Sequence, residues 1–287
     1  MDTITHTLFG LGIYAAVDKR DMKKHEKRAL LLTVVAGSQI PDIDVISRLW
    51  DYNGQYQMWH RGLTHSVFLV PLWGALLYWV SKMIFRHQMK KLLWIGMLSV
   101  FIHITSDVLN AWGTGYLEPF SQIRLSLGTV PIVDFVIWAV FLAAFLCWRM
   151  GRTAQHLVFR IAWAVILLHV SLQTLQGAYL LNTIGERYEQ AALSAEFLPW
   201  HYTIVAKSGK DISIGSAAVW KEYSIHTVLE SNEDADLSPL YAQNPRAAAL
   251  NTWSPFVVVV ENGNRLGIYD PRFYRNGESF LYEYIDK

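Results

Sequence analysis

The stretch HRGLTHSVFLVPLWGALLYWVSKMIF, residues 60–85, places an arginine and two histidines directly before a long apolar run. A helix needs ~20 apolar residues to cross the hydrocarbon core of a bilayer. The run at 67–85 therefore predicts a membrane span that begins beside a polar segment, HRGLTHS. Imidazole and guanidinium groups are costly to leave unpaired near hydrocarbon, so this segment indicates a functional site.

The composition predicts several further spans. Hydrophobic residues make up 52% of the chain and charged residues 17%, whereas soluble domains are about 25% charged. The other apolar runs lie at 92–109, 130–148 and 158–182, with shorter ones at 3–17 and 29–41. We expect an all-α, multi-pass membrane bundle of about six helices, some of them short, over residues 1–184.

Lys and Arg are distributed unevenly between the connections. The segments 18–28, 82–91 and 149–160 hold thirteen of them, whereas 42–66 and 110–129 hold three. Basic loops stay on the cytoplasmic side of a membrane. The pattern predicts that the three basic segments are cytoplasmic and that the segment HRGLTHS faces the extracytoplasmic side.

Residues 185–287 have a different character. Short runs rich in Val, Ile and aromatic residues fill 201–228 and 255–284, and turn sequences such as ENGNR and RNGES separate them. The intervening 231–254 reads as a loop with a short helix. We expect a small β-rich extracytoplasmic domain.

Net charge argues against one kind of nucleic-acid binding, and the cysteine content excludes disulfides within the chain and cysteine-built zinc sites. The formal net charge is +1, which argues against nucleic-acid binding through a broad basic face. The one cysteine, Cys147, permits neither a disulfide within the chain nor a cysteine-built zinc site.

The predicted topology gathers scattered polar residues at the extracytoplasmic ends of the helices. The candidate metal ligands are His6, Asp42, Asp44, His60, His65, His103 and Asp107. Imidazole and carboxylate donors without thiolate suit Zn²⁺ first, with Mn²⁺ or Fe²⁺ as alternatives. Seven donors exceed the four that one structural zinc needs, which predicts more than one ion or indirect roles for some donors.

Four residues have candidate roles beyond metal binding or in place of it. Arg61 and Thr64 are candidate substrate contacts, because a guanidinium matches a pair of phosphate oxygens. Arg61 would also stabilise charge that develops on the substrate. Asp42 or Asp44, if not a ligand, would accept the proton of the attacking water.

Each of these residues also has a plain structural interpretation. Asp42 and Asp44 could cap a helix or form an Asx turn, and His6, His60 and His65 could be solvated interfacial residues. His103 and Asp107 are one helical turn apart and could pair only with each other. The shared location of all seven at one end of the bundle favours a single site.

Four motifs resemble those of a known family. MDxxTH at 1–6, PDID at 41–44, HRGLTHS at 60–66 and HxxxD at 103–107 are similar in order and spacing to the YdjM family. The resemblance extends over about residues 1–145 and includes Asp134. It implies an inner-membrane, metal-dependent hydrolase, also labelled LexA-binding, that is distantly similar to zinc-dependent phospholipases C and zinc nucleases.

The function expected from these features is hydrolysis of a phosphoester or lipid-like substrate at the outer membrane interface, with membrane lipids as partners. A metal-stabilised scaffold or regulator without turnover is the alternative. A transporter with a proton relay through His103, Asp107 and Asp134 is a third, but it would place polar groups along a path through both leaflets.

Overall fold

The structure is a computed structural model that describes residues 1–86, 89–151 and 153–287. His87 and Arg152, which belong to the predicted basic loops, lie outside the described residues. Contacts divide the chain into two compact units. The first comprises 1–44, 61–126 and 131–172, and the second comprises 45–60, 127–130 and 173–287. The domain division at residue 184 remains a prediction.

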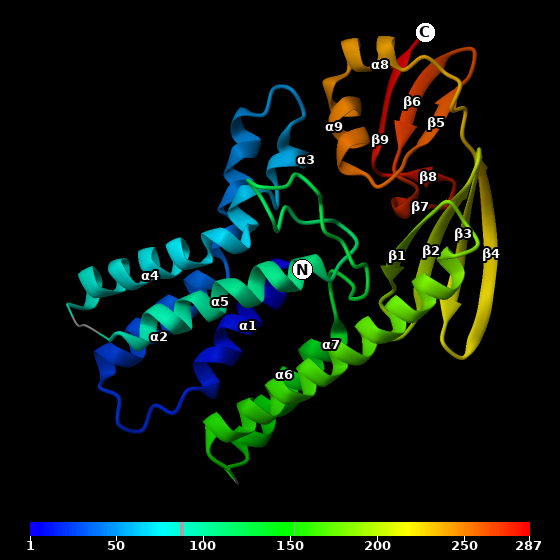
Figure 1. Ribbon diagram of the computed structural model, residues 1–287. Helices are drawn as coiled ribbons and strands as arrows, with labels where there is room; N and C mark the ends of the chain where they lie inside the picture. Colours follow the sequence, from blue (N-terminus) through cyan, green and yellow to red (C-terminus); the bar gives the residue numbers. More distant parts are fainter. Residues whose placement is uncertain (87–88, 152) are drawn as a thin grey trace. The chain divides into compact units, whose positions relative to one another are not determined.

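The first unit is built from antiparallel helices (Figure 1). Helix α2 contacts α1, α4 and α5, while α1 also packs against α5 and α6. The helices and 3₁₀ segments that begin in this unit are α1 (Thr3–Ala16), α2 (Lys24–Gly37), η1 (Ile40–Trp50), η2 (Leu63–His65), η3 (Val67–Leu69), α4 (Val70–Phe85), α5 (Lys91–Val108), α6 (Phe135–Arg149) and α7 (Gln155–Gly185). The helical class predicted for this region is confirmed.

Local sequence explains where several helices begin and end. The carboxylate of Asp2 accepts hydrogen bonds from the backbone N–H groups of Ile4 and Thr5, which caps α1. Asp134 caps α6 in the same way. Helix α4 ends at Phe85, and its C-cap residue, Arg86, has a φ of 49° in the left-handed region.

Among the described residues, three helical stretches are long and apolar enough to cross a membrane. They are Val67–Phe85, Lys91–Val108 and Gln155–Gly185. A fourth span is possible if α2 and η1, which are bent by 50°, count as one broken helix. Among the six predicted helices, α1 and α6 are shorter than a full span, and so is α2 taken without η1.

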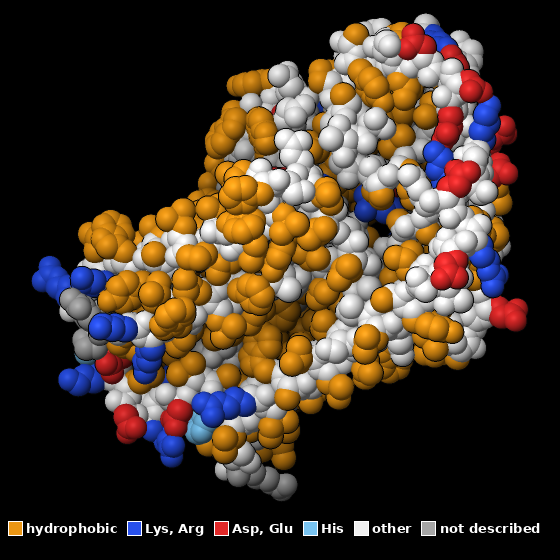
Figure 2. Space-filling view, viewed as in Figure 1, with side chains coloured by type: hydrophobic (Ala, Val, Ile, Leu, Met, Phe, Trp, Pro, Cys, Tyr) orange, Lys and Arg blue, Asp and Glu red, His pale blue; other side chains and the backbone are white. Residues whose placement is uncertain are grey.

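Charged side chains gather at one end of the first unit. Hydrophobic side chains dominate its visible surface, and Lys and Arg cluster where α1 joins α2 and α4 joins α5 (Figures 1 and 2). The predicted grouping of these basic loops on one side is thus present in the fold. The assignment of that side to the cytoplasm remains a prediction.

The second unit is rich in β-structure, as predicted. Its strands form a four-stranded antiparallel sheet β1-β2-β3-β4, a three-stranded antiparallel sheet β5-β6-β9 and the hairpin β7-β8. The strands are β1 (Gln190–Ala195), β2 (Tyr202–Ser208), β3 (Asp211–Ala218), β4 (Lys221–Glu230), β5 (Val258–Glu261), β6 (Arg265–Tyr269), β7 (Tyr274–Arg275), β8 (Glu278–Ser279) and β9 (Tyr282–Asp286). The helical segments are α3 (Tyr56–Trp59), α8 (Ser238–Gln243), α9 (Pro245–Trp253) and η4 (Pro271–Phe273).

The last turns of α7 supply part of the core of the second unit. Leu180 and Ile184 pack with Leu193, Tyr202 and Ile204 of the four-stranded sheet. The hydroxyl of Tyr202 donates to the carbonyl of Gln173 at 2.6 Å. The sheet therefore folds back along α7, with the start of β2 beside an earlier part of the helix.

Candidate metal centre

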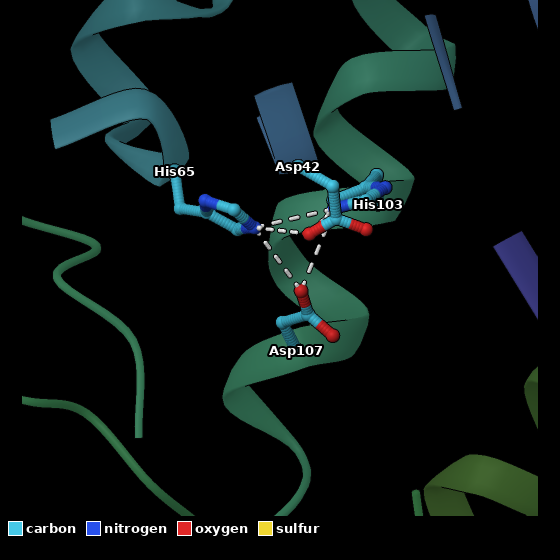
Figure 3. A group of neighbouring side chains, drawn as sticks. All are labelled: Asp42, His65, His103 and Asp107. Atoms are coloured by element: carbon cyan, nitrogen blue, oxygen red, sulfur yellow. Dashed lines mark hydrogen bonds and ion pairs between the residues drawn. The ribbon is translucent and has the colours of Figure 1, made fainter. Parts of the chain in front are cut away.

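The cluster forms where the helices of the first unit end on the side away from the basic loops. Asp42 follows the end of α2, His65 lies in η2 just before α4, and His103 and Asp107 lie in the last turns of α5. Figure 3 shows the four side chains pointing toward one another. The prediction that distant parts of the chain bring His65 and Asp107 together is confirmed.

A break after α2 positions Asp42. The α-helical pattern stops near Ser38, and the N–H of Asp42 donates to Gln39 in 3₁₀ geometry at 3.1 Å. Pro41 has no N–H to continue an α-helix. The chain turns by 50° here, which brings the Asp42 carboxylate toward α5.

Four ligand atoms converge at the centre of the cluster. Atoms of Asp42, His65, His103 and Asp107 all lie within 4.8 Å of one another. Nε2 of His65 lies 3.3 Å from Oδ1 of Asp42, 3.3 Å from Oδ2 of Asp107 and 3.3 Å from Nε2 of His103. Both imidazoles and Asp107 are fully buried, and the Asp42 side chain retains 22% exposure.

Hydrogen bonds away from the centre define the tautomers of both histidines. Nδ1 of His103 lies 2.7 Å from the carbonyl oxygen of Ser38, which can only accept, so this nitrogen carries the proton. Nδ1 of His65 lies 3.1 Å from the hydroxyl of Thr64. That hydroxyl donates to Asp44 at 2.8 Å, which leaves its oxygen free to accept from His65. With the proton on Nδ1, Nε2 of each imidazole points into the cluster, where its lone pair can bind a metal ion.

This donor set fits a divalent metal ion. Two imidazole lone pairs and two carboxylate oxygens face one another in a buried space, where they repel unless they share a cation. Within the described part of the chain, Oδ2 of Asp107 accepts no hydrogen bond. Metal-binding histidines usually donate the other ring N–H to a carbonyl or carboxylate, as His103 does to Ser38. All donors are nitrogen or oxygen, a set that zinc, manganese and iron all accept.

Asp44 and Thr64 lie one step outside the four ligand atoms. Oδ2 of Asp44 accepts from the hydroxyl of Thr64 and from the N–H of Arg61, each at 2.8 Å. The same oxygen lies 3.3 Å from Nδ1 of His65. Asp44 therefore contacts the face of His65 that points away from the centre. Its prediction as a direct ligand and that of Thr64 as a substrate contact remain predictions.

Arg61 places a positive charge against the cluster. Its Nη2 lies 3.3 Å from Oδ1 of Asp107 and donates to the carbonyl of Met1 at 3.1 Å. The backbone of Arg61 has a φ of 56°, a left-handed conformation that non-glycine residues rarely adopt. The N–H bond to Asp44 and a 2.7 Å bond from the N–H of Gly115 to the Arg61 carbonyl hold it there. Its role as a catalytic or substrate-binding residue remains a prediction.

His6 reaches the cluster through Asp107. Its Nε2 lies 3.4 Å from Oδ1 of Asp107, and its ring stacks on His103 with centroids 3.7 Å apart. Neither ring nitrogen makes a hydrogen bond within the described part of the chain, although the side chain is fully buried. The backbone amino group of Met1 also contacts Asp107. His6 thus lies beside the four converging atoms, and its predicted role as a ligand is open.

His60 belongs to the second compact unit. It follows α3, and its ring stacks on Tyr56 with centroids 5.3 Å apart. Its assignment as a metal ligand remains a prediction.

Sequence reasoning missed three groups that orient the site. The carbonyl of Ser38 fixes the tautomer of His103, Oδ1 of Asn110 accepts from Nη1 of Arg61 at 3.1 Å, and Nη1 of Arg124 donates to the carbonyl of Arg61 at 2.9 Å. Asn110 follows Asp107 by three positions, a spacing that could have suggested it. No side-chain pattern reveals a backbone carbonyl such as that of Ser38.

Asp134, which forms part of the resemblance, has a separate partner. Its Oδ2 lies 2.9 Å from Nε2 of His169 in α7, and both side chains are buried. This pair connects the start of α6 to α7 and takes no part in the cluster described above.

Comparisons with known proteins agree with this architecture. Residues 1–179 match the model of the family described as YdjM inner membrane protein. The chain is 34% identical over 155 residues to the uncharacterized protein YfhP of Bacillus subtilis (strain 168), a match that covers 53% of this chain and 47% of the relative. The match thus spans about half the length of that relative. No solved structure matches the chain.

Proposed function

Because the chain belongs to the YdjM inner membrane protein family, we propose that it is a membrane-bound, metal-dependent hydrolase. The observation that carries this proposal is the convergence of Asp42, His65, His103 and Asp107 within 4.8 Å in a buried part of the helical unit. Its substrate is a phosphoester or a related lipid-like molecule at the outer membrane interface.

The four converging residues would hold the ion through Nε2 of each histidine and one oxygen of each carboxylate. Zinc fits this donor set best, and manganese or iron could also occupy it. A bound divalent ion supplies Lewis acidity, which lowers the pKa of water toward neutrality and polarises a substrate oxygen. His6 and Asp44, the further predicted donors within the helical unit, are candidates for binding a second ion.

The surrounding residues have distinct roles in this proposal. Arg61 lies against Asp107, so its guanidinium is placed to stabilise negative charge that develops on a phosphoryl oxygen. Asp44 and Thr64 orient His65 through its Nδ1. Asp42 is the most exposed of the four central groups and marks the side from which water and substrate would approach.

The location of the cluster supports a lipid-like substrate. The four groups lie at the ends of apolar helices long enough to cross a bilayer. A site at this depth meets lipid headgroups, which carry phosphoester bonds. The basic loops at the opposite end of the helical unit favour an extracytoplasmic location for the cluster.

The proposal is tested by metal analysis of the full chain in detergent. We expect wild type to retain about one equivalent or more of a transition metal, as a site with four protein donors should. His65→Ala and His103→Ala should lose most of it, whereas His226→Ala should not, because His226 is an exposed histidine of β4. Substoichiometric metal in wild type, unchanged in His65→Ala, would overturn the proposal.

The deep burial of the cluster favours a second candidate, a metal-stabilised scaffold without turnover. His65, His103 and Asp107 have no exposed side-chain surface, as in closed structural sites. Assays of metal-loaded protein against phospholipids and soluble phosphoesters separate the two. Release of product by wild type and its loss in Arg61→Gln, with metal content retained, support the hydrolase. Full metal occupancy without turnover on any of these substrates supports the scaffold.

A further inference from the structure

The second unit carries a concentration of exposed apolar side chains at one end of its four-stranded sheet. The loop 196–201 joins β1 to β2, and residues 219–220 join β3 to β4. Both connections lie at the same end of the sheet. Tyr202, at the start of β2, pairs with Ala195 at the end of β1 and with Ala217 near the end of β3. The exposed residues are Phe197 at 57%, Leu198 at 65%, Trp200 at 41%, Val219 at 46% and Trp220 at 60%.

These residues form one patch, here called the aromatic tip. The rings of Trp200 and Trp220 meet edge to face with centroids 6.2 Å apart. The ring of His201 also contacts that of Trp220, with centroids 5.5 Å apart. Trp200 has a φ of 65°, a costly conformation for a bulky residue. The fold thus keeps a large aromatic side chain at the surface in spite of backbone strain.

Contacts with α7 fix the level of the aromatic tip along that helix. Tyr202, directly after the loop, donates its hydroxyl to the carbonyl of Gln173. Leu193 in β1 packs so closely on Gly177 that an added Cβ there would lie 2.7 Å from its side chain. The sheet end beside the loop therefore lies level with Gln173, about 18 Å before the end of α7 at ~1.5 Å of rise per residue.

The exposed side chains of α7 indicate where a membrane span within this helix would end. Large apolar side chains are exposed from Leu157 onward, and the last two are Leu175 at 67% and Tyr179 at 61%. Polar residues follow, including Asn182 and Glu186. A span of ~20 residues that starts near Leu157 ends close to residue 176. This count places Gln173, and with it the sheet end that carries the aromatic tip, in the last turn of the predicted span.

We propose that the aromatic tip inserts into the headgroup region of the leaflet from which α7 emerges. Trp favours this region, because its ring is apolar while its N–H stays hydrated. The patch lies within two helical turns of Leu175 and Tyr179, the last exposed large apolar side chains of α7, so lipid is the partner that its position offers. Lys221, which directly follows the tip and is exposed, is placed to meet lipid phosphates. The β-rich unit would then be attached to the membrane both by α7 and by this patch.

Site-specific fluorescence in nanodiscs tests the proposal with the full chain. Cys147 is replaced by serine, because it is the one cysteine of the sequence and is exposed. A bimane label is then attached to Leu198→Cys. The matched control is Ser208→Cys at the opposite end of the same sheet, where Ser208 pairs with Asp211 beside the β2–β3 turn. Both positions are exposed, so folding should tolerate both changes.

The expected result is a contrast between the two labels. With brominated acyl chains in the nanodisc, the label at residue 198 should lose most of its fluorescence and resist aqueous iodide, whereas the label at 208 should show the reverse. Equal behaviour of the two labels would overturn the proposal. Protection of residue 198 from both quenchers would also overturn it, since protein would then cover the tip. A label at Trp220→Cys provides an independent repeat on the second connection.

Discussion

Thr64 links the carboxylate of Asp44 to the imidazole of His65. Its hydroxyl donates to Asp44 and lies 3.1 Å from Nδ1 of His65. We expect Thr64→Val to lower metal affinity by about 10–100-fold, the usual cost of losing a group that orients a ligand. Thr64→Ser keeps the hydroxyl and should restore most of the affinity.

Competition with a chromophoric chelator measures both affinities on detergent-solubilised protein. Equal binding by wild type and Thr64→Val would show that the hydroxyl does not orient His65. A matching loss in Thr64→Ser would point instead to the threonine methyl group and its packing.

The sequence indicates the ligands better than the groups that orient them. His103 and Asp107 follow from their i, i+4 spacing within an apolar run, where unpaired polar groups are costly. His65 and Asp42 follow from their places at helix ends. The tautomer of His103 depends on the Ser38 carbonyl, which becomes available only through the geometry of a helix break. The left-handed conformation of Arg61 likewise depends on contacts from three separate segments.

At the scale of elements, the site depends on close packing between α1 and α2. A Cβ on Gly10 would lie 2.6 Å from Oγ of Ser38 and 2.9 Å from the carbonyl oxygen of Val34. Gly10→Ala should therefore push the two helices apart, at a cost of about 1–3 kcal/mol in the free energy of unfolding. This steric cost should exceed the helix propensity gained, about 1 kcal/mol.

Thermal unfolding in detergent, with metal content measured in parallel, checks this prediction. Because Ser38 also orients His103, Gly10→Ala should reduce metal content as well as the melting temperature. Gly185→Ala is the control, since its added Cβ would meet Ala191 at an ordinary 3.6 Å. A melting temperature for Gly10→Ala at or above that of wild type would contradict the packing argument.

Element prediction succeeded where apolar runs are long and failed where composition is neutral. The runs at 67–85 and 92–109 correspond closely to α4 with its preceding 3₁₀ turn and to α5. The strand β1 was missed, because its sequence, QAALSA, is poor in the β-branched and aromatic residues that favour strands. Its pairing with β2 and its packing on α7 form it instead, and such tertiary contacts cannot be seen in a local window.

At the scale of the whole molecule, metal binding should be coupled to folding. The four donors come from three separate segments of the chain, so the unfolded state has no equivalent site. Removal of a metal present at about a thousand times its dissociation constant would cost ~4 kcal/mol of stability. We expect a strong chelator to lower the melting temperature of the helical unit, and added Zn²⁺ to restore it.

The control for this experiment is His65→Ala, whose melting temperature should respond to neither chelator nor metal. An equal response of wild type and His65→Ala to the chelator would show that the stabilising ion binds elsewhere. Circular dichroism in the far ultraviolet follows the unfolding of each unit, because helices and strands contribute differently to that signal. Tryptophan fluorescence provides a second measure of unfolding.

The interruption between α2 and η1 has a consequence for how this protein can change. In an uninterrupted α-helix the Ser38 oxygen would receive the amide of residue 42, but that amide bonds to Gln39 instead. This break in the helix thus turns Asp42 inward. It also leaves the Ser38 carbonyl to accept the proton on Nδ1 of His103, 65 positions further along the chain. A substitution that regularises the helix would gain local backbone order and lose both effects together. We therefore expect natural variation at Gln39 and Pro41 to be limited by the position of Asp42 and the tautomer of His103, rather than by the stability of the helix that contains them.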